Sequence, residues 1–227
     1  MKDSIKQASA YSNRAQRNWN RDIAIPEEDV ATLLEVIKNA PTKQNETHYK
    51  VWWSDDTDKI KEIYECTNHF TVTPLDSLFD HTDERGVTDS KYNVTNSQIY
   101  SNLIFAFCMD WEAEHLRSLA HKNDGIILDS QRYMSIGVAV GELILSANLL
   151  GYRTGLCSAF DEEEMEFFFN GDRPRLIVGV GVPSDRPRTE HEDVYNRDIV
   201  AVDRRTGPDD EKWKFPSFEQ KMKIEKL

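Results

Sequence analysis

Apolar residues recur at helical spacing in the segment between Pro26 and Pro41, at Val30, Leu33, Leu34 and Ile37. This spacing predicts a helix that begins near Pro26 and ends before Pro41. The polar residues 5–18 ahead of it are also expected to be helical, and residues 58–64 predict a further short helix. The first third of the chain is therefore expected to be mostly helical.

Three other segments have the length and composition of strands, at residues 49–53, 103–108 and 176–182. The last two are almost continuously apolar, which is typical of strands that are buried on both faces. Residues 153–160 predict a strand or a turn that enters the next helix, with Asp161 as its N-cap. Residues 71–100 hold few periodic apolar positions, and we interpret them as an excursion over a site.

The strongest helical pattern covers residues 131–150, where nearly every face is apolar. A helix that is apolar almost all round is expected to be buried. Gly137 and Gly141 lie four residues apart in it and would permit close approach of another backbone. We therefore expect this helix to pack tightly near a subunit interface, and Gly151 to end it.

The order of these elements predicts an α+β fold, an α/β sandwich rather than a Rossmann repeat, and no GxGxxG, Walker, HExxH or GxSxG motif occurs. Residues 1–202 are expected to form one domain, and residues 203–227 a C-terminal extension after the break at Gly207 and Pro208. Aromatic residues among the charges of that extension are expected to pack on a partner subunit: Trp213, Phe215 and Phe218.

Composition narrows the possible partners of the 227-residue chain, of which 39% is hydrophobic and 30% is charged. The formal net charge of −12 argues against binding of nucleic acid, whose phosphates would repel the protein. The low apolar fraction fits a chain whose surface is partly covered by a second subunit. No apolar run is long enough for a membrane span and no signal peptide is evident, so we expect a cytoplasmic protein without a membrane partner.

Candidate chemistry begins with Arg14 and Arg17, which could hold a phosphate through charge-assisted hydrogen bonds. Residues 42–45 offer a hydroxyl, a lysine and two amides that could read the edge of a planar polar ring. Taken singly, the arginines also fit a solvated helix face, and the loop fits a turn that ends a helix. The six histidines show no ligand spacing and the three cysteines are far apart, so neither a metal site nor a disulfide framework is predicted.

Four pieces of the chain together resemble the nitroreductase family. They are Arg14-Ala15-Gln16-Arg17, Ala40-Pro41-Thr42-Lys43-Gln44-Asn45, the long helix with Leu150-Gly151-Tyr152-Arg153-Thr154-Gly155-Leu156-Cys157, and Val178-Gly179-Val180-Gly181-Val182-Pro183 followed by Arg186 and Arg188. Their order and spacing match the family over roughly residues 10–195. The resemblance implies a nitroreductase-like fold, with a central mixed sheet flanked by helices and an extended C-terminal arm.

The resemblance also implies an FMN site between the subunits of a homodimer, and it assigns residues to it. The phosphate would lie at Arg14, Ala15, Arg17, Arg186 and Arg188, and the ring at Thr42, Asn45 and the backbone of Thr154, Gly155 and Leu156. The flavin would carry the chemistry without a protein nucleophile, taking hydride from NAD(P)H and passing it to a small electron-poor acceptor such as a nitroaromatic or quinone.

Two departures from the family pattern leave the substrate open, Ala15 in place of a serine and Thr47-His48-Tyr49 in place of Gln-Pro-Trp. Specialised relatives act in dehalogenation, flavin fragmentation or azoline oxidation. A flavin-binding or interaction protein that keeps the fold without NAD(P)H turnover is the alternative from a different class. Cys157 falls near the implied flavin, where a small buried residue is the expected role, and His48 fits either a substrate contact or an ordinary strand position.

Overall fold

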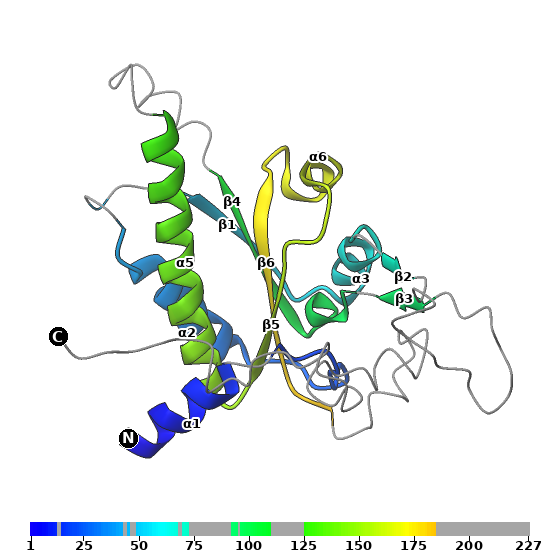
Figure 1. Cartoon of the computed structure of the whole chain (residues 1–227). Helices are drawn as coiled ribbons and strands as arrows, with labels where there is room; N and C mark the ends of the chain where they lie inside the picture. Colours follow the sequence, from blue (N-terminus) through cyan, green and yellow to red (C-terminus); the bar gives the residue numbers. More distant parts are fainter. Residues whose placement is uncertain are drawn as a thin grey trace, which may run out of the picture. The chain divides into compact units, whose positions relative to one another are not determined.

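A computed structural model (Figure 1) describes residues 1–12, 15–42, 45, 49–67, 70–72, 92–94, 96–109 and 125–184. The chain divides into two compact units, Met1–Asn68 with Asn96–Asp185 and His69–Thr95 with Arg186–Leu227. In the second unit, the described residues form two short strands, β2 (Phe70–Val72) and β3 (Tyr92–Val94), which pair antiparallel. The boundary predicted after residue 202 and the aromatic extension lie outside the described residues.

The first unit contains a four-stranded sheet in the order β1-β4-β6-β5. Its strands are β1 (Tyr49–Ser54), β4 (Leu103–Met109), β5 (Arg153–Cys157) and β6 (Pro174–Gly181). The three pairings between these neighbours are antiparallel, so the sheet formed by the described residues is antiparallel and not mixed as the resemblance implies. Every residue of β4 is buried, as its unbroken apolar run predicts. The strands expected from the sequence are thereby confirmed, with small differences at their ends.

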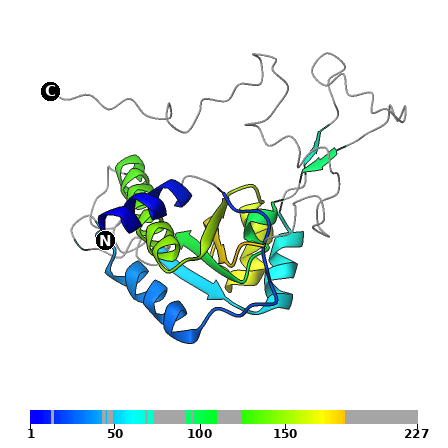
Figure 2. The same cartoon turned by 90° about the horizontal axis from the view of Figure 1, so that it is seen from below.

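Helices cover both faces of this sheet (Figures 1 and 2). Leu103, Phe105 and Phe107 of β4 pack with α2 (Glu27–Asn39) and α5 (Gly125–Leu149) in one apolar cluster. Ile104 and Ala106 face the opposite way, toward α3 (Thr57–Glu65), η2 (Ser97–Ile99), α6 (Glu162–Met165) and η3 (Glu166–Phe169). Successive side chains of a strand point to opposite faces, so one central strand supplies both cores. The predicted α+β sandwich is confirmed.

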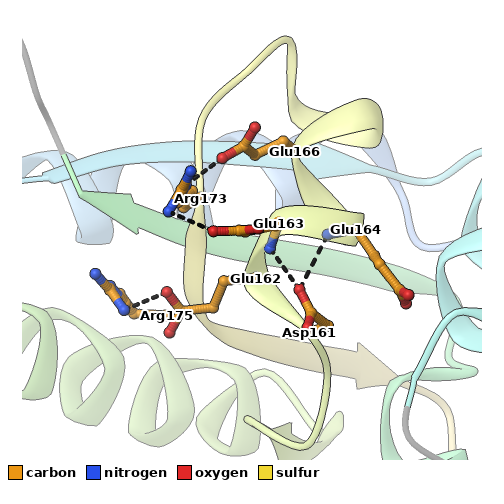
Figure 3. Close-up of polar contacts among 7 residues, drawn as sticks. All are labelled: Asp161, Glu162, Glu163, Glu164, Glu166, Arg173 and Arg175. Carbon is orange, nitrogen blue, oxygen red and sulfur yellow. Dashed lines mark hydrogen bonds and ion pairs between the residues drawn. The ribbon is translucent and has the colours of Figure 1, made fainter.

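The ends of the helices follow their capping residues. Three acidic residues occupy the first turn of α2, and the helix ends at Asn39, shortly before Pro41. The carboxylate of Asp161 caps α6 by accepting the N–H groups of Glu163 and Glu164 at 2.8 and 3.2 Å (Figure 3). This cap is the one that the sequence predicts.

Ion pairs attach α6 and η3 to the start of β6 (Figure 3). Arg173 contacts Glu166 and lies 3.4 Å from the carboxylate of Glu163, while Arg175 pairs with Glu162. Hydrogen bonding to Glu166 raises the pKa of the Arg173 guanidinium, so the arginine stays charged. Five of the side chains drawn in Figure 3 therefore form ion pairs within the fold.

The first helix is shorter than the predicted 5–18, because α1 (Lys2–Ser12) ends at Ser12 and residues 15–18 are not helical. Backbone hydrogen bonds to distant parts of the chain replace the helix there. The N–H of Gln16 donates to the Thr154 carbonyl at 2.8 Å, and the N–H of Asn20 donates to the Val182 carbonyl at 2.8 Å. Pairing with the sheet thus overrides the local helical preference of this segment.

The long helix α5 begins at Gly125, earlier than predicted, and its burial is one-sided. Ala139, Leu143 and Ala147 have no exposed surface, whereas Tyr133, Met134 and Val138 are exposed by 51%, 60% and 41%. Apart from the adjacent residues and the backbone of the helix itself, no heavy atom of the described residues lies within 4 Å of a Cβ built on Gly137 or Gly141. The close backbone approach expected at these glycines is therefore not made within the described part of the chain. None of the described helices is long and apolar enough to span a membrane.

Candidate active site

Two of the segments implied as the cofactor site meet at β5. The backbone bond from Gln16 to Thr154 places residues 15–17 along the outer edge of this strand. Ala15 is exposed there and Arg17 is half-buried. Arg14, Arg186 and Arg188 lie outside the described residues. The structure thus brings together Ala15, Arg17 and Thr154, which are far apart in the sequence.

The geometry of the antiparallel ladder determines which backbone groups face that edge. The Thr154 carbonyl is bonded to Gln16, so the polar backbone groups of Thr154 point away from β6. Backbone groups of a strand alternate in direction, so those of Leu156 point the same way. The N–H and carbonyl of Leu156 therefore face the edge along which residues 15–17 run. A donor and an acceptor at this place fit the mixed polar edge of a flavin ring.

Gly155 has a packing role that the sequence did not reveal. It lies opposite Gly179 of β6, and a Cβ on it would be 2.6 Å from the Cβ of Gln98 and 2.7 Å from the carbonyl oxygen of Gln16. A Cβ on Gly179 would overlap the carbonyl oxygen of Gln98. Only glycine at these positions allows residues 96–102 to lie directly on the two strands.

Buried polar groups hold residues 96–102 in this place. The indole N–H of Trp19 donates to the carbonyl of Ser97 at 2.8 Å. Asn102 donates to the carbonyl of Asn20 at 2.8 Å and accepts the N–H of Val182 at 3.0 Å. These bonds join the N-terminal segment, η2 and the end of β6.

Gln98 is the buried side chain of this segment nearest Gly155. Its amide donates to Asn96 at 3.1 Å, and its carbonyl oxygen accepts no hydrogen bond from the described residues. The sequence does not predict this role, because residues 71–100 hold few periodic apolar positions and are interpreted only as an excursion over a site. The run of polar residues 96–98 and 101–102 directly ahead of a buried strand is the signal that could have revealed it.

The Cys157 thiol at the end of β5 is buried, with the positive charge of Arg17 near it. Burial raises the pKa of the Cys157 thiol, and the N–H of Ala159 and the charge of Arg17 offset this only in part. The thiol therefore stays protonated at neutral pH, which agrees with the expected role of a small buried residue. The influence of Arg17 on Cys157 also shows that its positive charge lies near β5 in a chain of net charge −12.

The loop after α2 supplies the other implied ring contacts. Thr42 is half-buried, and Asn45 is exposed with a φ of 55° in the left-handed region. The N–H of Asn45 donates to the Thr42 carbonyl at 3.2 Å, as in a turn. None of the hydrogen bonds described for Thr42 or Asn45 reaches β5, and His48 lies outside the described residues. Within the described ranges, no three His, Cys, Asp or Glu side chains gather as metal ligands would.

Comparison with known proteins identifies the family and the fold of the chain. The model of the nitroreductase family matches residues 10–182. No curated protein sequence matches the chain. Solved structures with a similar fold include B. megaterium NfrA2, at 16% identity and a TM-score of 0.58, covering 88% of this chain and 78% of that one.

Two Vibrio structures are similar to the same degree. Nitroreductase A from Vibrio parahaemolyticus has 15% identity and a TM-score of 0.59, covering 89% of this chain and 83% of its own. The NADPH:FMN oxidoreductase from Vibrio harveyi, complexed with NAD+, has 13% identity and a TM-score of 0.58, covering 88% and 83%. These likenesses show a shared fold. Because the family model spans most of the chain, the protein belongs to the nitroreductase family, and this membership places it among oxidoreductases.

Proposed function

We propose that the protein is an FMN-dependent oxidoreductase that takes reducing equivalents from NAD(P)H and passes them to a small electron-poor acceptor, such as a nitroaromatic or quinone. The observation that carries this proposal is the bond from the Gln16 N–H to the Thr154 carbonyl. It joins the segment implied to hold the phosphate to the segment implied to hold the ring, at an edge of the sheet that carries a positive charge.

The residues proposed to hold FMN fall into two groups. Arg14, Ala15, Arg17, Arg186 and Arg188 would surround the phosphate, for which guanidinium groups supply paired donors. Thr42 and Asn45 would address the ring from one side, and the backbone of residues 154–156 from the other. The chain offers FMN both donors and acceptors, as the edge of its ring requires. When bound, the flavin supplies the redox chemistry.

The protein's own contribution would be binding, orientation and electrostatics. The positive charge of Arg17 favours an anionic cofactor in an otherwise acidic protein. The hydrogen bonds of residues 96–102 and the glycines beneath these residues would fix the position of the strand without taking part in the reaction. No cysteine nucleophile is required, and the raised pKa of Cys157 fits its absence from the chemistry.

A homodimer is part of this proposal. The outward side of α5 exposes Tyr133, Met134 and Val138, and there is open space at Gly137 and Gly141 of the same helix. An adjoining groove between α2 and α5 has an apolar part lined by Ala31, Val36 and Leu145. A second copy of the chain would cover this surface, which is too apolar to be expected on an isolated monomer.

Sedimentation of the wild type and of Val138→Arg tests the dimer. We expect a dimeric wild type and a variant shifted toward monomer, because an arginine would be buried without a partner at the interface. Phe167→Arg is the matched control, since Phe167 is an apolar residue of η3 that is 87% exposed and lies on the other face of the sheet, away from the α2 and α5 groove. A monomeric wild type would contradict the proposal.

The identity of the cofactor tests the main proposal. The chromophore of the purified protein, or of the apoprotein after incubation with flavins, is released by heat and separated by chromatography. FMN is expected, because the matched basic residues leave one phosphate to be bound. Recovery of FAD alone, or of no flavin after reconstitution, would contradict the proposal. Bound FMN that no nicotinamide reduces would indicate a flavin-binding protein without this turnover.

A further inference from the structure

The last turn of α5 contains a buried amide, Asn148, that contacts both α1 and β5. Its amide N–H groups donate to the Ile144 carbonyl at 2.8 Å and lie 3.4 Å from the Ser12 hydroxyl and 3.5 Å from the Thr154 hydroxyl. The bond to Ile144 fixes the orientation of the amide, because a carbonyl can only accept. The other side of the amide, its carbonyl oxygen, is buried and accepts no hydrogen bond from the described residues.

Two bonds fix the start and the middle of the implied phosphate segment, Arg14 to Arg17. Ser12 precedes it and lies against Asn148 of α5, while Gln16 lies within it and is bonded to β5 through the carbonyl of Thr154. Thr154 is itself one of the groups that Asn148 contacts. A single amide therefore contacts both the residue that precedes this segment and the strand residue to which the segment is bonded.

A second contact supports the same end of α1. The guanidinium of Arg153 lies over the ring of Tyr11, 3.6 Å from its centroid, one residue before Ser12. Ala8, on the same helix, is buried. The packing of Ala8 and Tyr11 explains why α1 adheres to α5 and β5. It does not explain a buried amide at residue 148, where an apolar side chain would leave no acceptor without a partner.

We propose that Asn148 is a positioning residue for the cofactor phosphate. It fixes the end of α1 relative to β5, and thereby the placement of the segment that carries Arg14 and Arg17, without touching the cofactor. This inference rests on the proposed function. It predicts that FMN affinity depends on a residue that lies outside the list of cofactor contacts and that the family resemblance does not assign.

The test is a titration of apoprotein with FMN, followed by flavin fluorescence, for the wild type and Asn148→Ala. We expect the variant to bind FMN about tenfold more weakly, which corresponds to roughly one ordinary hydrogen bond. Ser12→Ala should weaken binding less. The double variant should be no weaker than Asn148→Ala alone, because both changes break the same link.

Ser135→Ala is the matched control. Ser135 lies more than three turns earlier on α5, is buried like Asn148 and makes the same kind of local bond, from its hydroxyl to the Gln131 carbonyl at 2.9 Å. The control variant should bind FMN within about twofold of the wild type, a smaller change than the loss of one hydrogen bond produces. Equal weakening in both variants would contradict the proposal.

Two further readouts separate positioning from a merely structural role. Hydrogen exchange of the apoprotein should become faster at residues 12–17 in Asn148→Ala, and the reduction potential of bound FMN should stay unchanged, because the phosphate is remote from the ring. A lower melting temperature with unchanged FMN affinity overturns the inference while the proposed function stands. A wild type that binds no FMN overturns both.

Discussion

The apolar layer between the sheet and the pair α2 and α5 differs in kind from the edge of β5. In the layer, residues such as Leu33, Phe105 and Leu143 are fully buried and interact through non-directional packing. At the edge, the chain is held by directional bonds such as Gln16 to Thr154, and by glycines that admit a neighbouring backbone. The first region supplies stability through buried area, and the second supplies a defined arrangement of donors, acceptors and charge.

This difference separates residues that keep the protein folded from residues that give it a site. A change in the apolar layer should lower the free energy of unfolding and leave the affinity of the folded protein for FMN unchanged. A change at the edge of β5 should lower FMN affinity and leave the free energy of unfolding nearly unchanged, unless it alters a glycine that serves both roles. The following variants test that separation.

The largest effect is expected for Leu143→Ala, which removes a fully buried side chain from α5. The cost should be about 2–5 kcal/mol in the free energy of unfolding, as for other large-to-small core changes. Leu149→Ala on the same helix is the control, since Leu149 is 47% exposed and its loss should cost about 0.5 kcal/mol or less. Denaturant unfolding measures both. Equal decreases in the free energy of unfolding would contradict the claim that only one side of α5 is packed in the apolar layer.

At the edge of β5, Arg17→Ala should weaken FMN binding by about 1.5–3 kcal/mol, the range for hydrogen bonds to charged groups. Arg21→Ala carries the same change in net charge in the same segment, but its guanidinium stacks 3.4 Å from the centroid of the Tyr100 ring. It should alter FMN affinity little. Titration with FMN measures both, and the assigned role of Arg17 is wrong when its loss leaves affinity unchanged.

The contrast between these regions also explains what could be predicted from the sequence. The helix of residues 27–39 and strand β4 were predictable, because their apolar residues repeat at the spacing of the element. The end of α1 was predicted wrongly, since bonds from Gln16 and Asn20 to distant strands replace the helix. Periodicity describes neighbours in sequence and holds no information on such pairings.

The site was predictable in part for the same reason. The resemblance indicated Arg17 and the segment 154–156, and the structure brings the backbone of residues 15–17 to that segment. It gave no indication of Gln98, Asn102 or Asn148, whose roles arise only from contacts across the fold. The resemblance implied Gly155 only as a contact of the cofactor. The packing of Gln98 against it is a second reason why this position is a glycine.

Gly179 of β6 contributes to both regions, so Gly179→Ala should lower both the free energy of unfolding and FMN affinity. Its Cβ would overlap the Gln98 carbonyl and lie 2.8 Å from the Ser101 hydroxyl, which should cost about 1–3 kcal/mol as overpacking does. FMN affinity should fall as well, because residues 96–102 would shift. Gly137→Ala is the control, with open space around its Cβ, and should stabilise α5 by up to about 1 kcal/mol. A destabilised Gly137→Ala would instead indicate a close contact there in the dimer.

The smallest effect concerns a polar bond within the apolar layer. The hydroxyl of Tyr152 donates to the carboxylate of Asp29 at 2.5 Å, and burial together with this bond raises the pKa of Tyr152 to about 12. Tyr152→Phe should cost about 1.5 kcal/mol at neutral pH. Thermal unfolding of both proteins across pH measures this difference.

The pH range of this effect follows from its sign. A tyrosine in the unfolded chain titrates near pH 10, and its pKa in the folded protein is higher. Its contribution is therefore fully present below about pH 10 and is lost as the pH rises toward 12. The stability difference between wild type and Tyr152→Phe should shrink over that range. A constant difference would mean that the hydroxyl bond does not raise the pKa.

Anaerobic reduction of the FMN-loaded protein tests whether the edge of β5 serves an oxidoreductase. NADH and NADPH are added separately while the visible absorbance of the flavin is recorded, and a nitroaromatic or quinone is then added to the reduced protein. At least one nucleotide should bleach the absorbance, and the acceptor should restore it without oxygen. An FMN-loaded protein whose absorbance neither nucleotide changes would contradict the proposed activity.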